Sequence, residues 1–198
     1  GNDISANGNL KTSAGSLKID GGKENRHLSL SVSTNDCNLA KILDNDKLGI
    51  LATEIKVTAL LQNEAKKALN GKVGKGILGK IQQLTANGNI DKLQYNGYVY
   101  SNINIDGKLD GNNISGQLAI NDDNIKLNAD GAFATDHPKA DLQLQLGNIC
   151  PKALGLTDKW GDACFAANVD ADFVGTNVDN ANGNITISNF SMATAEDT

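Results

Sequence analysis

The sequence predicts an all-β protein built as one long, curved antiparallel sheet with an apolar concave face. Three observations support this: period-two alternation of aliphatic and polar residues, turn signals between the alternating stretches, and an internal repeat. Such strands bury one face and leave the other in water, as antiparallel sheets commonly do. Short helices are expected only in the loops that join them.

The repeat consists of an alternating strand, a cysteine, a short apolar turn of helix and a second alternating strand. Residues 28–59 and 142–173 share this order, with Cys37 and Cys150 at matching places about 113 residues apart. A second signature, Ala-Asn-Gly-Asn followed by Leu or Ile, begins at Ala6, Ala86 and Ala181. We therefore expect one β segment over residues 1–198, made of two quasi-repeats of about 1–90 and 91–198.

The expected strands follow one another along the chain. Their alternating apolar positions are Leu28/Leu30/Val32, Ile55/Val57/Ala59, Leu93/Tyr95, Ile103/Ile105, Leu118/Ile120, Ile125/Leu127/Ala129, Leu142/Leu144/Leu146, Val169/Ala171/Phe173 and Ile185/Ile187. Gly-, Asn- and Asp-rich turn signals separate them at residues 20–22, 96–97, 110–113 and 121–124.

One block departs from the strand pattern. Residues 61–78 carry apolar residues at helical spacing and the helix-favouring run Glu64-Ala-Lys-Lys-Ala-Leu, with several glycines after it. The second quasi-repeat has no counterpart, so we expect a helical insertion or lid at the rim of the sheet.

The two central hairpins predict strand register. A loop at residues 110–113 pairs Leu109 with Ile114, Gly107 with Gly116, Ile105 with Leu118 and Ile103 with Ile120. A loop at residues 121–124 pairs Ile120 with Ile125, Leu118 with Leu127, Gly116 with Ala129 and Ile114 with Gly131. The small residues then form a row across three strands, where we expect the sheet to bend.

The apolar face of these strands is the candidate functional surface. We expect it to be lined by Ile103, Ile105, Leu109, Ile114, Leu118, Ile120, Ile125, Leu127, Leu142, Leu144, Leu146, Val169, Ala171 and Phe173. Aromatic residues make up only 4% of the chain, with one Trp and one Met, which is little for a tightly packed sandwich core. An open apolar trough fits this composition better.

Other kinds of site are poorly supported. The net charge of −5 and the absence of a basic stripe argue against nucleic acid as a partner. Residues 74–81 resemble a phosphate-binding loop but have Ile81 where Ser or Thr should hold Mg²⁺. Residues 44–55 start like a calcium loop, with Leu48 at a ligand position. Neither His27 nor His137 has a catalytic or ligand spacing, so we expect no enzyme activity, metal site or cofactor.

Three cysteines leave at least one without an intramolecular partner. Cys150 and Cys164 flank a short segment that a disulfide could close. We favour the interpretation of the cysteines as small buried thiols, and the match between Cys37 and Cys150 favours a packing role at a corner.

Residues 142–192 resemble the AsmA-like/TamB family of Gram-negative envelope proteins. The resemblance rests on Leu-Gln-Leu-Gln-Leu, Cys150-Pro-Lys-Ala-Leu-Gly-Leu-Thr, and Ala-Asn-Val-Asp-Ala-Asp-Phe-Val-Gly-Thr followed by Asn-Gly-Asn-Ile-Thr-Ile. The Asn- and Lys-rich composition is similar to Bacteroidetes members, whereas the insertion at residues 61–78 departs from the family pattern. The resemblance implies a β-groove that is U-shaped in section and spans the periplasm, in a parent protein whose membrane anchor lies outside this segment.

The same resemblance implies the function. We expect a non-enzymatic segment of an envelope-biogenesis protein, whose groove serves phospholipid passage, translocation and assembly of outer-membrane proteins, or both. Its partners would be phospholipid acyl chains or unfolded outer-membrane protein clients, together with an outer-membrane barrel. The alternative is a structural β-repeat segment of a secreted or cell-surface (adhesin-like) protein, because Asn/Gly/Asp-rich repeats also suit that role.

Overall fold

The structure, a computed structural model, describes residues 3–62, 80–134, 139–174 and 182–194. It is all-β, as predicted, with a single short helix in the described part, α1 (Leu39–Leu43). The strands are β1 (Ile4–Thr12), β2 (Gly15–Glu24), β3 (His27–Asn38), β4 (Leu48–Leu61), β5 (Ile81–Tyr95), β6 (Tyr98–Asp110), β7 (Asn113–Asn121), β8 (Lys126–Ala134), β9 (Lys139–Ile149), β10 (Cys164–Val174) and β11 (Asn182–Ala193).

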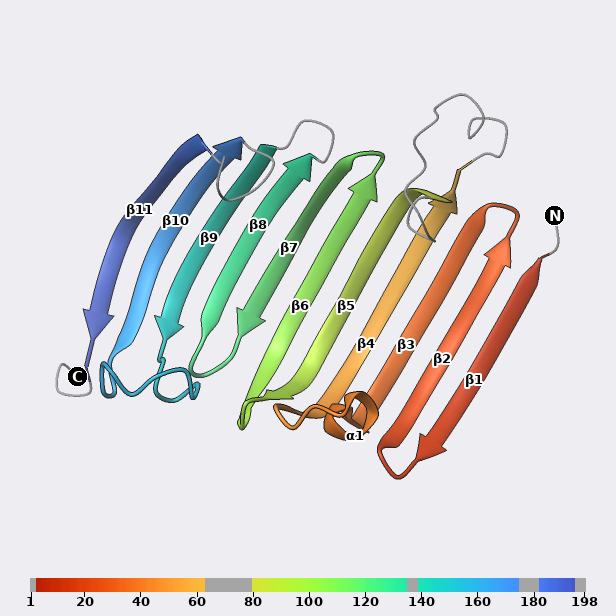
Figure 1. The fold of residues 1–198 in the computed structure, drawn as a ribbon, viewed down its shortest axis with the longest axis horizontal. Coiled ribbons are helices and arrows are strands. Elements are labelled where there is room, and N and C mark those ends of the chain that lie inside the picture. The colour runs from red at the N-terminus through yellow and green to blue at the C-terminus, as the bar shows by residue number, and fades with distance from the viewer. Residues whose placement is uncertain (1–2, 63–79, 135–138, 175–181, 195–198) are drawn as a thin grey trace.

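All eleven strands form one open antiparallel sheet in which each strand pairs with its neighbours in sequence, from β1 at one edge to β11 at the other. Figure 1 shows this sheet as a single layer whose strands bend along their length, most visibly β10 and β11. Such a meander follows from the sequence because short turns join most consecutive strands, and short turns require antiparallel neighbours.

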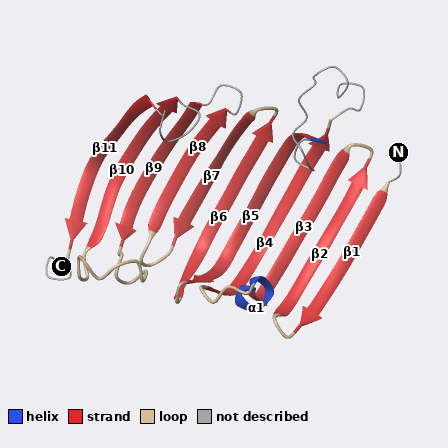
Figure 2. Cartoon of the chain, in the orientation of Figure 1, coloured by secondary structure: helices blue, strands red, loops and turns tan. Residues whose placement is uncertain are grey.

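Helix α1 lies at one end of the strands, where it joins β3 to β4 (Figure 2). The segment between β9 and β10 lies at the same end, which we call the helix end of the sheet. The Asn38 side chain begins α1 by accepting a hydrogen bond from the backbone N–H of Lys41, and Asp44 ends it in a left-handed conformation. The helix expected within residues 61–78 lies outside the described residues, apart from Leu61, which ends β4, and Gln62.

The register predicted between β6 and β7 is confirmed. Ile103 pairs with Ile120, Ile105 with Leu118, Gly107 with Gly116 and Leu109 with Ile114. The two-residue turn at Gly111 and Asn112, with Gly111 in a left-handed conformation, sets this pairing.

The register predicted between β7 and β8 is wrong by two residues. Ile120 pairs with Leu127, Leu118 with Ala129 and Gly116 with Gly131. Ile125 therefore lies in the turn before β8, and its carbonyl accepts a hydrogen bond from the N–H of Asp122. A shift of two residues leaves the side chains within β8 on their predicted faces, because side chains alternate with a period of two.

The Asp122 side chain explains the longer turn. It is 5% exposed. One of its carboxylate oxygens accepts hydrogen bonds from the N–H and the hydroxyl of Ser101 at 3.0 and 2.6 Å; the other accepts from the N–H of Asn124 at 3.0 Å and from the Tyr98 hydroxyl. These bonds tie the turn to the start of β6. Asp122 thus leaves the β7–β8 ladder to become a buried acceptor for a neighbouring strand.

Candidate functional site

The strand registers place the aliphatic side chains in continuous rows that cross the whole sheet. One row takes a residue from every strand: Gly8, Ile19, Val32, Ile55, Gly88, Ile105, Leu118, Ala129, Leu144, Val169 and Ile187. No member of this row is polar. We call the surface that carries it the apolar face.

The adjacent row points to the opposite surface, the polar face. It consists of Asn7, Asp20, Ser31, Lys56, Asn87, Asp106, Gln117, Asp130, Gln143, Asp170 and Thr186. Hydrogen bonds within it include Asn87 Nδ2 to Asp106 at 2.6 Å and Gln117 Nε2 to Asp130 at 2.7 Å. The sheet therefore has one face suited to water and one that is not.

Thirteen of the fourteen predicted groove residues lie on the apolar face, in four neighbouring rows. The rows are Ile103–Ile120–Leu127–Leu146, then Ile105–Leu118–Leu144–Val169 with Ala129 between, then Leu142–Ala171, then Leu109–Ile114 and Phe173. The exception is Ile125, which the turn removes from the strands.

Glycine occupies part of the Leu142–Ala171 row, at Gly107, Gly116 and Gly131. The row of small residues was predicted to end at Ala129, which instead pairs with Leu118 because of the register shift. A Cβ atom on Gly116 would meet the carbonyl oxygen of Asp106 at 2.9 Å, closer than real Cβ atoms approach backbone. At Gly116 the backbones of β6 and β7 therefore lie too close together to admit a side chain.

The apolar face has no second sheet of described residues packed on it. Its side chains are mostly half-buried between their cross-strand neighbours; Ile103 is 5% exposed, whereas Ile114 remains 45% exposed. Large exposed residues on this face extend to both edges, as with Ile19, Leu30, Phe133 and Ile187. Contiguous exposed apolar surfaces of this kind are typical of interaction sites.

The segment between β9 and β10 packs at the helix end of the sheet. A disulfide joins Cys150 to Cys164 across it, and the Cys150 N–H donates to the carbonyl of Asn124 at 3.0 Å. Leu154, 2% exposed, is its most buried large side chain. The interpretation of Cys150 and Cys164 as buried thiols is therefore wrong; their backbones lie opposite each other, with Cα atoms 4.2 Å apart.

The third cysteine, Cys37, is buried and free, as the odd count requires. Its strand partner is Leu51, so the Cys37–Leu51 pair stands where the quasi-repeat has Cys150 and Cys164. The first quasi-repeat thus has a buried thiol opposite a leucine at the place where the second has a disulfide bond.

Irregularities in strand pairing keep the apolar face continuous at the helix end. Register shifts occur between Phe165 and Ala167 and between Ala166 and Asn168, near Asn148 and Asn189, which both have positive φ. One extra residue in a strand reverses the faces that follow it. The exposed Phe190 and Met192 consequently join Phe165 on the apolar face, with 6.3 Å between the Phe165 and Phe190 rings. Strict alternation carries no sign of these bulges.

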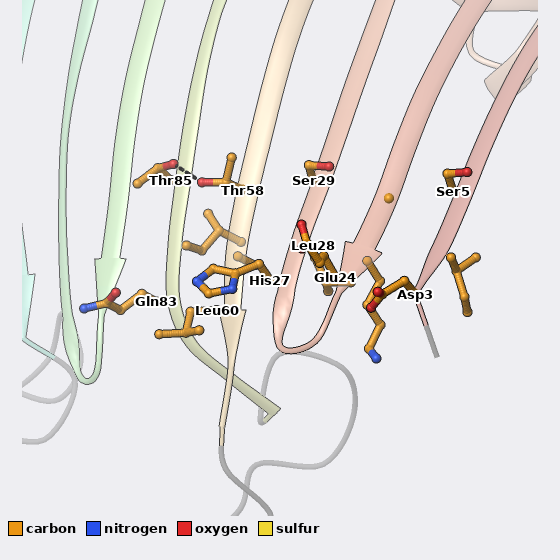
Figure 3. Close-up of a pocket in the computed structure, with 15 residues that line it drawn as sticks. Asp3, Ser5, Glu24, His27, Leu28, Ser29, Thr58, Leu60, Gln83 and Thr85 are labelled. Carbon is orange, nitrogen blue, oxygen red and sulfur yellow. Dashed lines mark hydrogen bonds between the residues drawn. The ribbon is translucent and has the colours of Figure 1, made fainter. Parts of the chain in front are cut away.

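A separate hollow of about 800 Å³ lies at the end of β1 to β5 opposite the helix end. Figure 3 shows its lining: hydroxyls from Ser5, Ser29, Thr58 and Thr85, charged Asp3 and Glu24, and His27. The Thr58 and Thr85 hydroxyls are hydrogen-bonded at 2.6 Å. These residues were not predicted as a site, because they meet only through the pairing of strands far apart in sequence.

The described residues that line the hollow form no catalytic arrangement. Its single histidine faces Leu60 across the strands, and no described hydroxyl in it is hydrogen-bonded to that imidazole. In the described part of the chain no three His, Cys, Asp or Glu side chains cluster in a way that could hold a metal ion. No helix among the described residues is long and apolar enough to cross a membrane. His137 lies outside the described residues.

Comparison with models of known protein families, with curated protein sequences and with solved structures found no match to this chain.

Proposed function

We propose that this chain is a non-enzymatic segment of a cell-envelope protein whose apolar face holds phospholipid acyl chains as they pass along the sheet. The observation that carries the proposal is that two neighbouring rows of the apolar face, the row of Ile105 and the row of Leu142, hold no polar residue over eleven strands. No second sheet of described residues covers them. Each CH₂ group that an acyl chain buries there contributes about 0.8 kcal/mol. A single chain can therefore be held without a specific polar contact.

Two further features support an envelope location. Disulfides persist in oxidising compartments such as the periplasm, and Cys150–Cys164 is a disulfide. The resemblance of residues 142–192 to the AsmA-like/TamB family implies the same compartment, an anchored parent protein and an outer-membrane barrel partner. Unfolded outer-membrane protein clients are the second cargo that this family implies, because their strands also alternate between apolar and polar residues.

The test is lipid capture by matched variants. Ile105→Asp/Leu118→Asp puts two charges on the apolar face, and Asn104→Asp/Ala119→Asp puts two charges on the adjacent, likewise directly opposed pair of the same strands on the polar face. Each protein is purified from bacteria, checked for folding by circular dichroism, and analysed for bound phospholipid by mass spectrometry. We expect wild type and the polar-face variant to carry lipid and the apolar-face variant to lose most of it.

A crosslinking measurement covers the case in which the apolar-face variant unfolds. A photoreactive benzophenone side chain at position 105 should label phospholipid in vesicles, and one at position 104 should not. Equal labelling from the two faces would refute the acyl-chain proposal. The structural β-repeat alternative would then account for the sheet.

A further inference from the structure

One lysine lies on the apolar face. Lys23 of β2 pairs with Ile4 of β1 and with Leu28 of β3. Their row continues through Ala59 and Leu84. In the four neighbouring rows of the apolar face, Lys23 is the one charged side chain among the residues that the structure describes. β2 is an inner strand, so this position does not depend on what lies beside β1.

The ammonium group of Lys23 forms no ion pair or hydrogen bond with another described residue. Glu24, the nearest carboxylate along the strand, takes the opposite face because side chains alternate. A lysine on an apolar surface keeps its aliphatic stem on that surface and holds its charged group at the edge, in water. Lys23 is half-buried and is the last residue but one of β2, so this edge is the end of the sheet opposite the helix end.

We propose that Lys23 binds the phosphate of a phospholipid whose acyl chains lie on the apolar face along β2 and β3. The inference rests on the proposed function, and it adds a polar contact to a surface that otherwise selects only for hydrocarbon. A phosphodiester carries one negative charge, and a lysine ammonium binds phosphate as a point charge. Because one side of the contact is hydrocarbon rather than water, the attraction is stronger than between two fully exposed charges.

Two further cations lie at the same end of the sheet. The carbonyl of Arg26 accepts a hydrogen bond from the N–H of Leu61, and the carbonyl of Lys80 accepts one from the N–H of Gln62, both at 2.8 Å. These bonds place Arg26 and Lys80 beside the end of β4. With Lys23 they exceed the two described carboxylates that line the hollow there, in a chain whose net charge is −5. This end of the apolar face is therefore suited to the anionic group of a lipid.

The apolar strip that begins at Lys23 is long enough for an acyl chain. On β2 the side chains of Gly21, Ile19 and Leu17 follow it on the same face. The six residues from Lys23 to Leu17 span about 20 Å at about 3.3 Å per residue. An acyl chain spans half of the hydrocarbon core of a bilayer, which is about 15 Å. A phosphate at Lys23 therefore leaves its acyl chains on an apolar surface along their whole length.

Two lipids with the same acyl chains separate the phosphate contact from hydrocarbon binding. Dioctanoyl phosphatidylglycerol has a phosphate and dioctanoylglycerol has none, and displacement of a neutral apolar dye measures the binding of each. Lys23→Gln should weaken binding of the phospholipid about five- to tenfold and leave binding of the diacylglycerol unchanged. Lys23→Arg, which keeps the charge, should bind both lipids as wild type does. The matched control is Lys11→Gln, which removes the same charge from the polar face of β1 and should change neither affinity.

The two proposals fail in different ways. If wild type binds neither lipid, the acyl-chain proposal fails and this inference fails with it. If wild type binds both lipids and Lys23→Gln weakens both equally or neither, only the phosphate contact is overturned. A loss that Lys23→Arg does not restore, or that Lys11→Gln reproduces, overturns it as well. The difference between wild type and Lys23→Gln should also shrink at high salt, because added ions screen a contact between charges at the surface.

Phosphorus NMR locates the phosphate without changing Lys23. A nitroxide label on Glu24→Cys should broaden the phosphorus signal of bound phosphatidylglycerol. The same label on Ser13→Cys, in the turn at the helix end between β1 and β2, should leave that signal sharp, because the length of β2 separates the two positions. The free Cys37 is buried and common to both variants. Equal broadening from the two labels, or stronger broadening from Ser13→Cys, would show that the phosphate lies elsewhere and would overturn the inference.

Discussion

Removing the Asp122 carboxylate should destabilise the protein far more than removing the carboxylate of Asp123, the next residue. Asp122→Ala leaves four hydrogen-bond donors without their acceptor. They are the N–H and hydroxyl of Ser101, the N–H of Asn124 and the Tyr98 hydroxyl. The two hydroxyls can rotate toward other acceptors, but the two backbone N–H groups cannot. An unsatisfied buried donor costs about 1–3 kcal/mol, so we expect a loss of about 3 kcal/mol in the free energy of unfolding.

The matched control is Asp123→Ala. The Asp123 side chain is exposed, and the interaction of this residue with Asn148 uses the backbone carbonyl, which alanine keeps. Its substitution should change stability by less than about 0.5 kcal/mol. Urea unfolding followed by circular dichroism measures both variants.

The effect should depend on pH. Burial by itself raises the pKa of the Asp122 carboxyl, but the hydrogen bonds from Ser101, Tyr98 and Asn124 outweigh it and hold the pKa below its usual value. A lowered folded-state pKa contributes stability that is present above the unfolded value near 4 and is lost as the pH falls through the folded value. The difference between Asp122→Ala and wild type should therefore shrink in acid. Equal losses for Asp122→Ala and Asp123→Ala at neutral pH would refute the role given to this carboxylate.

Three further outcomes follow from strand pairing. Leu51→Cys should form a second disulfide with Cys37, which mass spectrometry detects as the loss of the free thiol. For a loop of this length the disulfide should add up to about 3 kcal/mol to the free energy of unfolding. A Cys37 thiol that stays reduced would contradict the match between the quasi-repeats. Gly116→Ala should lower the midpoint of urea unfolding, whereas Gly107→Ala, whose added Cβ has no atom closer than 3.8 Å, should not; equal midpoints would contradict the close approach. Asp172→Asn should raise the melting temperature at neutral pH. The hydrogen bond with Asp141 on the neighbouring strand, and repulsion from it, raise the pKa of Asp172. Wild type therefore loses stability as the pH rises through that pKa. If the higher melting temperature of Asp172→Asn persisted below about pH 3, this cause would be wrong.

The sequence by itself determined which face of the sheet the aliphatic side chains take within each regularly alternating stretch. Alternation has a period of two, as strands do, so the aliphatic positions from Leu28 to Ile187 share a surface whatever the detailed pairing. It also determined the β6–β7 register, because a two-residue turn with Gly111 permits only one pairing. The predicted β7–β8 register was wrong by two residues, which is one full period of the alternation, so the side chains within β8 kept their faces.

Only the tertiary structure decided the features that depend on residues far apart in sequence. The β7–β8 register follows from Asp122, whose donors lie 21 and 24 residues earlier on another strand. The Cys150–Cys164 disulfide requires β9 and β10 to bring the two residues opposite each other. The bulges near Asn148 and Asn189 return Ile149 and Phe190 to the apolar face, where Phe165 lies. The hollow around His27 likewise exists only because five strands lie side by side. Local alternation sets the direction of a side chain, but hydrogen bonds and contacts across the sheet select its neighbours.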